Sequence, residues 1–300
     1  MTEPYHIPAM LNETILGLNI QPDGIYVDAT FGGGGHSRAI LAHLGEKGRL
    51  FSFDQDWEAY ENARTAEEKT NRITEDKRWQ FVHGNFRYLH NFLDYYGIDQ
   101  VDGILADIGV SFHHFDTADR GFSFRFEGPL DMRMNRQGGK TAADIVNTYS
   151  EDDLARVLYL YGELHNSRQL ARKLVSMRPV TRTEQLATVT QDKKVLTCLF
   201  QALRIEVNDE LGALSEMLLA ARDLLKPQGR LAILTYHSLE DRLVKNFLRS
   251  GNLEGNIEKD FYGNTLTPFT LIEKGKTADQ EEVARNPRSR SAKLRVAAKI

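Results

Sequence analysis

The stretch Asp28-Ala-Thr-Phe-Gly-Gly-Gly-Gly-His-Ser37 decides the fold of this chain. It follows a short apolar run, Ile25 to Val27, and precedes the segment His36 to Leu44, whose apolar residues recur at helical spacing. A strand, a glycine turn and a helix in this order are typical of a nucleotide-type cofactor site. Glycines let a ligand lie against the backbone, and the helix N-terminus offers unpaired N–H groups. The alternative, a loose surface loop, leaves the flanking strand and helix unexplained.

Strands and helices continue to alternate after the glycine turn. Asp54 ends the next predicted strand, twenty residues beyond Gly34, which is the offset at which an acid of a dinucleotide fold accepts hydrogen bonds from ribose hydroxyls. The run Val101 to Ile108 is almost continuously apolar, so we expect a strand that is buried on both faces. This alternation predicts an α/β fold with a mostly parallel, doubly wound sheet. The other expected elements are strands over 49–54 and 79–85, and helices over 56–69 and from residue 86 onward.

The alternation stops at Gly109, and a different region begins there. Residues 111–140 show no sustained period and predict a long loop, whereas residues 141–203 are helical throughout. We therefore predict one domain over 1–111 and 204–300, with a loop and an all-helical insertion for substrate recognition over 112–203. The sheet domain is expected to resume with a helix over 208–225, a stop at 227–229, a strand over 230–236 and a helix over 239–248. Short strands over 269–272 and 294–297 complete it, with loops over 251–265 and 274–286.

Composition and charge limit the classes of function. The chain has 300 residues, 41% of them hydrophobic, and a formal net charge of −4, which argues against wholesale electrostatic wrapping of nucleic acid. The C-terminal segment from Ala284 to Ile300 nevertheless carries six basic residues and no acid. This segment is either a local basic patch for a nucleic acid or a solvated face.

Cysteine usage and hydropathy favour a cytoplasmic protein. Cys198 is the only cysteine, so an internal disulfide is impossible and a reducing compartment is expected. We find neither a secretory signal nor an apolar run of the roughly 20 residues that cross a bilayer. The nine histidines lack the spacing of metal ligands, so we expect no metal site.

The glycine pattern discriminates between cofactors. A dinucleotide fingerprint, G-x-G-x-x-G/A, fails in both registers, because Ser37 or Arg38 stands where the third glycine is needed. A nicotinamide-dependent dehydrogenase is therefore disfavoured. The carboxylate of Asp28 would repel a phosphate but attract the ammonium group of an amino acid. Together with Asp54, Asp28 favours S-adenosyl-L-methionine as the ligand.

Several motifs together resemble one family, the RsmH (MraW) methyltransferases, which act on N4 of a cytidine in small-subunit ribosomal RNA. The resemblance implies a Rossmann-like class I methyltransferase domain with a helical insertion, S-adenosyl-L-methionine as methyl donor, and 16S ribosomal RNA in the small ribosomal subunit as acceptor. It leaves the oligomeric state open, with a homodimer as one alternative. The matching stretches are the glycine turn, Asp102-Gly-Ile-Leu-Ala-Asp-Ile-Gly-Val-Ser111, Arg120-Gly-Phe-Ser-Phe-Arg125, Gly128-Pro-Leu-Asp-Met-Arg-Met134, Phe200-Gln-Ala-Leu-Arg-Ile205, Tyr236-His-Ser-Leu-Glu-Asp-Arg242 and Asn286-Pro-Arg-Ser-Arg-Ser-Ala-Lys-Leu-Arg295.

Two segments depart from the family pattern. The family usually continues Gly-Val-Ser with Ser-Pro-Gln, whereas this chain has Phe112-His113-His114, and Val195-Leu-Thr-Cys-Leu199 replaces a polar, arginine-containing run. An imidazole at His114 can still donate or accept one hydrogen bond. Carried over by position, the resemblance assigns cofactor contacts to Gly34, Gly35, His36, Asp54, Phe86, Asp107 and His114.

Methyl transfer to a cytosine amine requires alignment and the loss of a proton. Asp107, at the end of the predicted strand over 101–108, is our candidate for polarising the N4–H group; the alternative is that it only binds cofactor. His237 and Ser238 follow the predicted strand over 230–236, so they lie on the same edge and either contact substrate or support the site. The Asn/Asp-Pro-Pro-Tyr motif of amino-methylating DNA enzymes is absent from the sequence.

Substrate contacts are expected in the basic and aromatic stretch from Ser111 to Lys140. Its arginines alternate with phenylalanines, which suits phosphate contacts and base stacking. Alternatively the phenylalanines form a hydrophobic latch, and Asp131 simply pairs with Arg133. The candidate substrate residues are Arg125, Arg133, His237, Ser238, Arg288 and Arg290. A different class of function, an RNA-binding ribosome assembly factor without catalysis, is the alternative that the altered segment over 112–114 suggests.

Overall fold

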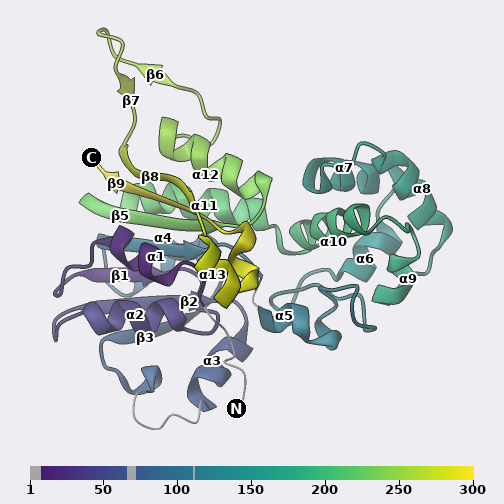
Figure 1. The fold of residues 1–300 in the computed structure, drawn as a ribbon, viewed down its shortest axis with the longest axis horizontal. Helices are drawn as coiled ribbons and strands as arrows, with labels where there is room; N and C mark the ends of the chain where they lie inside the picture. The colour runs from purple at the N-terminus through teal and green to yellow at the C-terminus, as the bar shows by residue number, and fades with distance from the viewer. Residues whose placement is uncertain (1–7, 66–71, 111) are drawn as a thin grey trace. The chain divides into compact units, whose positions relative to one another are not determined.

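The computed structural model describes residues 8–65, 72–110 and 112–300. Contacts divide the chain into two compact units, the first of Met1–Gly109 with Gly212–Ile300 and the second of Val110–Leu211. The first unit contains the sheet and the second is helical (Figure 1). Within the described residues, no helix is both long and apolar enough to span a membrane.

The first unit is built on a seven-stranded sheet with the strand order β3-β2-β1-β4-β5-β9-β8. The first five of these strands are parallel, while β9 is antiparallel to both of its neighbours. The strand order reverses beside β1, so β1 and β4 flank the crevice in which open α/β sheets bind ligands. The strands are β1 (Ile25–Asp28), β2 (Arg49–Asp54), β3 (Trp79–His83), β4 (Val101–Asp107), β5 (Leu225–Thr235), β8 (Phe269–Thr277) and β9 (Lys293–Lys299).

Helices cover both faces of this sheet, and successive residues of its central strands are accordingly buried on both faces. Phe51 points to a core shared with α4, α11 and α12, whereas the neighbouring Leu50 points to a core shared with α1, α2 and α3. The doubly wound α/β fold is therefore confirmed. The helices are α1 (Leu11–Leu18), α2 (Gly35–His43), α3 (Trp57–Thr65), α4 (Leu89–Tyr95), α11 (Glu210–Leu224), α12 (Ser238–Ser250) and α13 (Gln280–Arg285), with short 3₁₀ turns η1 (Ile73–Glu75), η2 (Phe86–Tyr88) and η4 (Pro287–Ser291).

Several predicted boundaries were wrong. The expected stop at 227–229 is a bulge within β5, because the pairing with β4 shifts between Val101↔Leu225 and Gly103↔Arg230. The expected loop over 274–286 contains the end of β8 and all of α13. The expected loop over 251–265 forms a hairpin of β6 (Glu258–Lys259) and β7 (Thr265–Leu266). The last residues of the helix predicted over 56–69 lie outside the described residues.

The second unit has its own apolar core, in which Leu154, Leu170 and Leu199 are buried. The long loop predicted over 111–140 contains two short turns of helix, and the buried guanidinium of Arg120 donates to the carbonyls of Arg133 (3.2 Å) and Met134 (3.0 Å). The helices are α5 (Phe112–Asp116), α6 (Ala142–Thr148), α7 (Glu151–Gly162), α8 (Ser167–Ser176), α9 (Thr183–Ala187) and α10 (Lys193–Asn208), with the 3₁₀ turn η3 (Ala118–Arg120).

Candidate functional site

The glycine turn between β1 and α2 leaves backbone open to a ligand. Gly32 (φ 51°) and Gly34 (φ 74°) adopt left-handed conformations, which favour glycine. A β-carbon on Gly34 would lie 2.8 Å from the Phe31 ring, whereas one on Gly32 would have no neighbour within 4 Å. Gly34 is the N-cap residue of α2, and no side chain caps this helix. The turn therefore offers open space at Gly32 beside the start of α2, where the N–H groups of a helix N-terminus can receive a ligand.

Asp28 lies beneath the turn and is fully buried. The Ser37 hydroxyl donates to Asp28 Oδ2 at 2.6 Å, and the Thr30 N–H donates to Oδ1 at 3.1 Å. Burial raises the pKa of Asp28 to about 7, although the bond from Ser37 opposes the shift. Asp28 thus ties β1 to α2 from inside the protein. Its expected contact with a ligand ammonium group stays a prediction.

Asp54 supports the turn from the neighbouring strand. Its Oδ2 accepts a hydrogen bond from Gly32 N–H at 2.8 Å, and its Oδ1 accepts one from Asp56 N–H at 2.9 Å. Both bonds hold backbone segments that leave the carboxyl edge of the sheet. The glycine turn and the Asp54 carboxylate consequently lie together, as their places in the sequence indicated.

Asp107 meets residues from two other elements at this edge. The Tyr236 hydroxyl donates to Asp107 Oδ1 at 2.7 Å, and Asp107 Oδ2 lies 3.8 Å from His36 Nδ1. Burial, reinforced by the Asp107 charge, raises the pKa of Tyr236 well above 10, so the phenol keeps its proton. Burial also lowers the pKa of His36 to about 4, so its imidazole is neutral near pH 7. The side chain of Asp107 is therefore positioned by a neutral phenol.

Sequence reasoning did not single out Tyr236. The available signal was its place in the chain, directly after β5 and next to the candidate His237. Phe86, another predicted cofactor residue, begins η2 after β3 and packs against the core that also contains Val27 and Ile104. Its contact with a cofactor stays a prediction, as do those of Gly34, Gly35 and His36.

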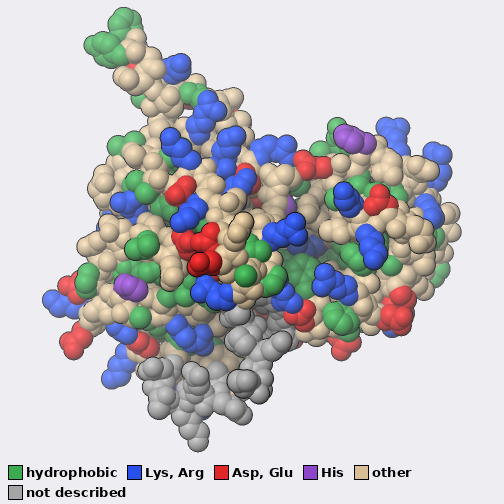
Figure 2. Space-filling view, in the orientation of Figure 1, with side chains coloured by type: hydrophobic (Ala, Val, Ile, Leu, Met, Phe, Trp, Pro, Cys, Tyr) green, Lys and Arg blue, Asp and Glu red, His purple; other side chains and the backbone are tan. Residues whose placement is uncertain are grey.

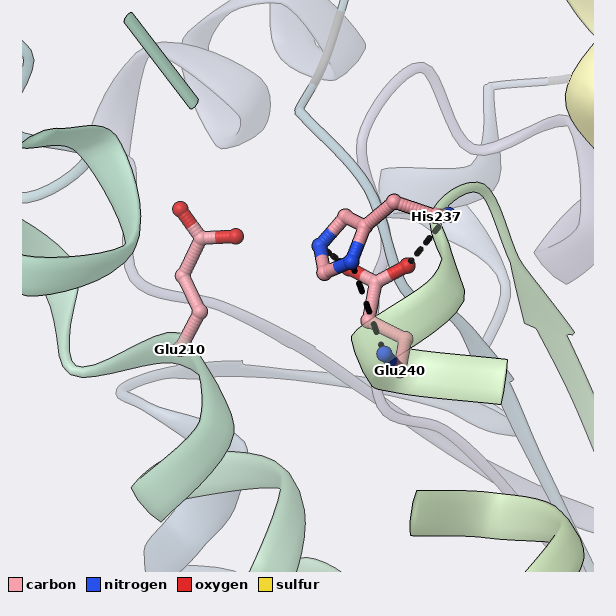
Figure 3. Close-up of side chains that lie close together, drawn as sticks. All are labelled: Glu210, His237 and Glu240. Carbon is pink, nitrogen blue, oxygen red and sulfur yellow. Dashed lines mark hydrogen bonds and ion pairs between the residues drawn. The ribbon is translucent and has the colours of Figure 1, made fainter. Parts of the chain in front are cut away.

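His237 begins α12 as its N-cap residue, opposite Glu240 (Figure 3). Glu240 N–H donates to His237 Nδ1 at 3.4 Å, and Glu240 Oε2 accepts from the N–H groups of Tyr236 (2.9 Å) and His237 (3.3 Å). Glu240 is only 1% exposed and its Oε1 lies 2.9 Å from His237 Nε2. This capping box fixes the entry into α12 and with it the backbone of Tyr236. Ser238, the first helical residue, is exposed.

Glu210, also drawn in Figure 3, is the first residue of α11 but falls within the second unit, which ends at Leu211, and there it binds Arg204 through two hydrogen bonds of 2.8 and 2.9 Å. His114 lies in the same unit. It is buried, and its ring stacks on Phe122 with the centroids 4.9 Å apart. The contact that the family resemblance assigns to His114 stays a prediction.

Some residues of the basic and aromatic stretch of the second unit fit the hydrophobic latch, and others fit contacts with a substrate. Arg133 makes a two-pronged pair with Asp131, with bonds of 2.8 and 2.9 Å. Phe122 is buried and Phe124 packs edge-on against Phe200, which fits the latch. Phe126 (43% exposed) and the exposed Arg125 remain available to a partner, and in the first unit Arg288 and Arg290 are exposed on η4.

Comparison with known proteins shows which family and which proteins the chain is similar to. A sequence model of the MraW methylase family matches residues 3–300. The chain is 57% identical over 309 residues to the ribosomal RNA small subunit methyltransferase H of Phocaeicola vulgatus, covering 98% of this chain and 97% of that protein. It is 56% identical over 306 residues to the protein of the same name from Bacteroides thetaiotaomicron, with 98% and 97% covered. Among solved structures, TrmN from Thermus thermophilus is 14% identical, with a TM-score of 0.41 over 97% of this chain and 48% of that one.

Proposed function

The chain belongs to the MraW methylase family, and we propose that it transfers a methyl group from S-adenosyl-L-methionine to N4 of a cytidine in 16S ribosomal RNA of the small ribosomal subunit. The observation that carries the chemistry is the placement of Asp107, held by Tyr236, at the same sheet edge as the glycine turn. The names of these relatives, ribosomal RNA small subunit methyltransferase H, support ribosomal RNA as the substrate class. The reaction is assigned to the cytoplasm, where ribosomal subunits are assembled.

The donor would be held by the residues around the glycine turn. The turn and the uncapped start of α2 would receive the aminoacyl part, and Asp54 would accept hydrogen bonds from the ribose. Phe86 would pack near the adenine. When bound, S-adenosyl-L-methionine supplies an electrophilic methyl group on a sulfonium. The protein's task is then to align the acceptor nitrogen with that methyl group and to exclude water.

Asp107 is proposed to accept the proton that N4 of the cytosine loses during methyl transfer. The lone pair of a cytosine amine is delocalised into the ring, so N4 becomes nucleophilic as its N–H bond is polarised by a nearby carboxylate. The Tyr236 hydroxyl donates a hydrogen bond to one oxygen of Asp107 and so fixes the orientation of the carboxylate. The imidazole of His36 is neutral, so it carries no positive charge that would compete with the N4–H group for this carboxylate. Asp107 therefore combines the position and the charge of a proton acceptor.

The reaction is tested with the full-length protein, isotope-labelled S-adenosyl-L-methionine and small subunits from cells that lack the protein. We expect label in 16S ribosomal RNA and, by mass mapping, a methyl group on N4 of one cytidine. Binding of subunits without transfer would overturn the catalytic function and favour the assembly-factor alternative. If calorimetry detects no binding of S-adenosyl-L-methionine, the cofactor assignment is wrong as well.

A further inference from the structure

The β6–β7 hairpin ends in two aromatic side chains that the fold leaves in solvent. Phe261 is 97% exposed and Tyr262 is 85% exposed. Their rings meet edge to face with the centroids 5.6 Å apart. Apolar rings of this size are usually buried, and adjacent exposed ones mark an interaction site.

The hairpin tip is a turn that is held by hydrogen bonds to Asp260. Asp260 Oδ1 accepts hydrogen bonds from the N–H groups of Tyr262 and Asn264, both at 2.8 Å, and its Oδ2 accepts one from the Asn264 side chain at 2.9 Å. Gly263 closes the turn with a left-handed φ of 85° and donates to the Asp260 carbonyl at 3.0 Å. These bonds fix the backbone conformation around Phe261, so the turn preorganises the two exposed rings.

The base of the hairpin is fixed to α12. Gly251 ends α12 with a φ of 77°, and a β-carbon there would lie 2.3 Å from Pro268 at the other side of the base. A β-carbon on Gly255 would lie 3.2 Å from the Asn246 side chain of the same helix. Phe261 follows Gly255 by six positions, so the tip lies within roughly 20 Å of Gly255.

The outward face of α12 is basic. Arg242, Lys245 and Arg249 are exposed and recur at helical spacing, so they share one face. The two acids of this helix do not offset them there, since Glu240 is buried and Asp241 is bound by Lys293 (3.0 Å) and Arg295 (2.8 Å). Figure 2 shows Lys and Arg side chains gathered below the projecting hairpin, whose tip is hydrophobic.

We propose that the hairpin tip and the basic face of α12 form a docking surface for single-stranded ribosomal RNA, in which the rings of Phe261 and Tyr262 stack on unpaired bases and Lys245 and Arg249 contact phosphates. Aromatic platforms beside a basic track are the means by which proteins hold single strands. The hairpin itself carries three acids, Glu254, Glu258 and Asp260, against one base, Lys259, so the phosphate contacts are assigned to α12 and not to the hairpin. A second copy of the chain fits less well, since a symmetric contact would bring two basic faces together.

The inference rests on the proposed function and specifies where the substrate is held. The test compares the full-length protein with the variants F261A/Y262A and K245A/R249A. Matched controls are Y95A, whose tyrosine is 82% exposed on α4, and K47A/K77A, which removes two exposed lysines of the same unit. Binding to a short single-stranded RNA of mixed sequence is measured over a series of salt concentrations, and KM and kcat are measured with unmethylated small subunits.

We expect K245A/R249A to weaken RNA binding and to reduce the salt slope by about 1.4, because each phosphate contact on a single strand contributes about 0.7. F261A/Y262A is expected to weaken binding at least about fivefold at every salt concentration, with an unchanged slope, because stacking is not ionic. For both variants KM for subunits rises while kcat stays the same. The control variants behave as the parent does.

Parent-like RNA affinity and KM in both variants would overturn the docking surface. A change confined to self-association, measured by light scattering, would also overturn it and would assign the hairpin to a contact between copies. If the parent protein binds RNA but transfers no methyl group, the proposed function fails by itself, and the RNA measurements still decide whether this surface binds RNA.

Discussion

The acids that end β1, β2 and β4 at the carboxyl edge of the sheet, Asp28, Asp54 and Asp107, have different hydrogen-bond partners. On the side proposed to bind the methyl donor (the donor side), which comprises the glycine turn with Asp28 and Asp54, the carboxylates accept hydrogen bonds largely from backbone N–H groups. On the side proposed to face the methyl acceptor (the acceptor side), which comprises Asp107 and Tyr236, Asp107 accepts a hydrogen bond from a side-chain hydroxyl. Asp28 and Asp54 therefore shape the chain around the glycine turn, whereas the bond from Tyr236 orients the side chain of Asp107. Substitutions on the two sides are expected to separate binding from transfer.

The largest effect is expected for Asp107→Asn. The amide keeps the size of the side chain but is a poor proton acceptor, so kcat for methyl transfer should fall by about 100- to 10,000-fold. Cofactor affinity, measured by calorimetry, should stay close to that of the parent. A loss of cofactor affinity that accounts for the whole fall would show that Asp107 only binds the donor.

The next effect concerns stability and the buried Asp28. Its folded pKa, about 7, lies above the usual value of 3.8, so the folded state binds the proton more tightly than the unfolded state does. This contribution is complete below about pH 4 and is lost as the pH rises toward 7, by up to about 4 kcal/mol in the free energy of unfolding. Asp28→Asn should remove this part of the pH dependence, as measured by urea unfolding at several pH values. If the free energy of unfolding depends on pH in the same way in the parent and the variant, this prediction is wrong.

Asp54→Ala should weaken cofactor binding by about 1–3 kcal/mol, because a charge-assisted hydrogen bond to the ribose and the support of Gly32 N–H are lost together. Calorimetry with S-adenosyl-L-methionine measures the loss. Asp23→Ala, which changes an exposed acid outside the site, serves as the control. Unchanged affinity would remove Asp54 from the donor side.

The donor side was far more predictable from sequence than the acceptor side. Asp28, the glycines and Asp54 are close in the chain, and their offsets follow from one strand–turn–helix–strand unit. The bond between Tyr236 and Asp107 joins residues 129 positions apart, and only the placement of β5 beside β4 brings them together. The same limit explains the misread stop at 227–229, since local turn signals do not reveal that the segment pairs with β4 as a bulge.

Tyr236→Phe gives the smallest expected effect and the sharpest test of the comparison. The variant keeps the ring but loses the hydroxyl that donates to Asp107, so the carboxylate loses one of the contacts that fix its orientation. We expect kcat to fall about tenfold, which corresponds to one hydrogen bond of about 1.4 kcal/mol, while KM and cofactor affinity stay unchanged. Because the hydroxyl stabilises the carboxylate form of Asp107, its loss should also move the acidic limb of the kcat profile to higher pH. In an Asp107→Asn background the second substitution should have little further effect, because a positioning residue acts only through the group that it positions. Full additivity in this double-mutant cycle would mean that Tyr236 acts independently of Asp107 and that the acceptor side is not a coupled pair.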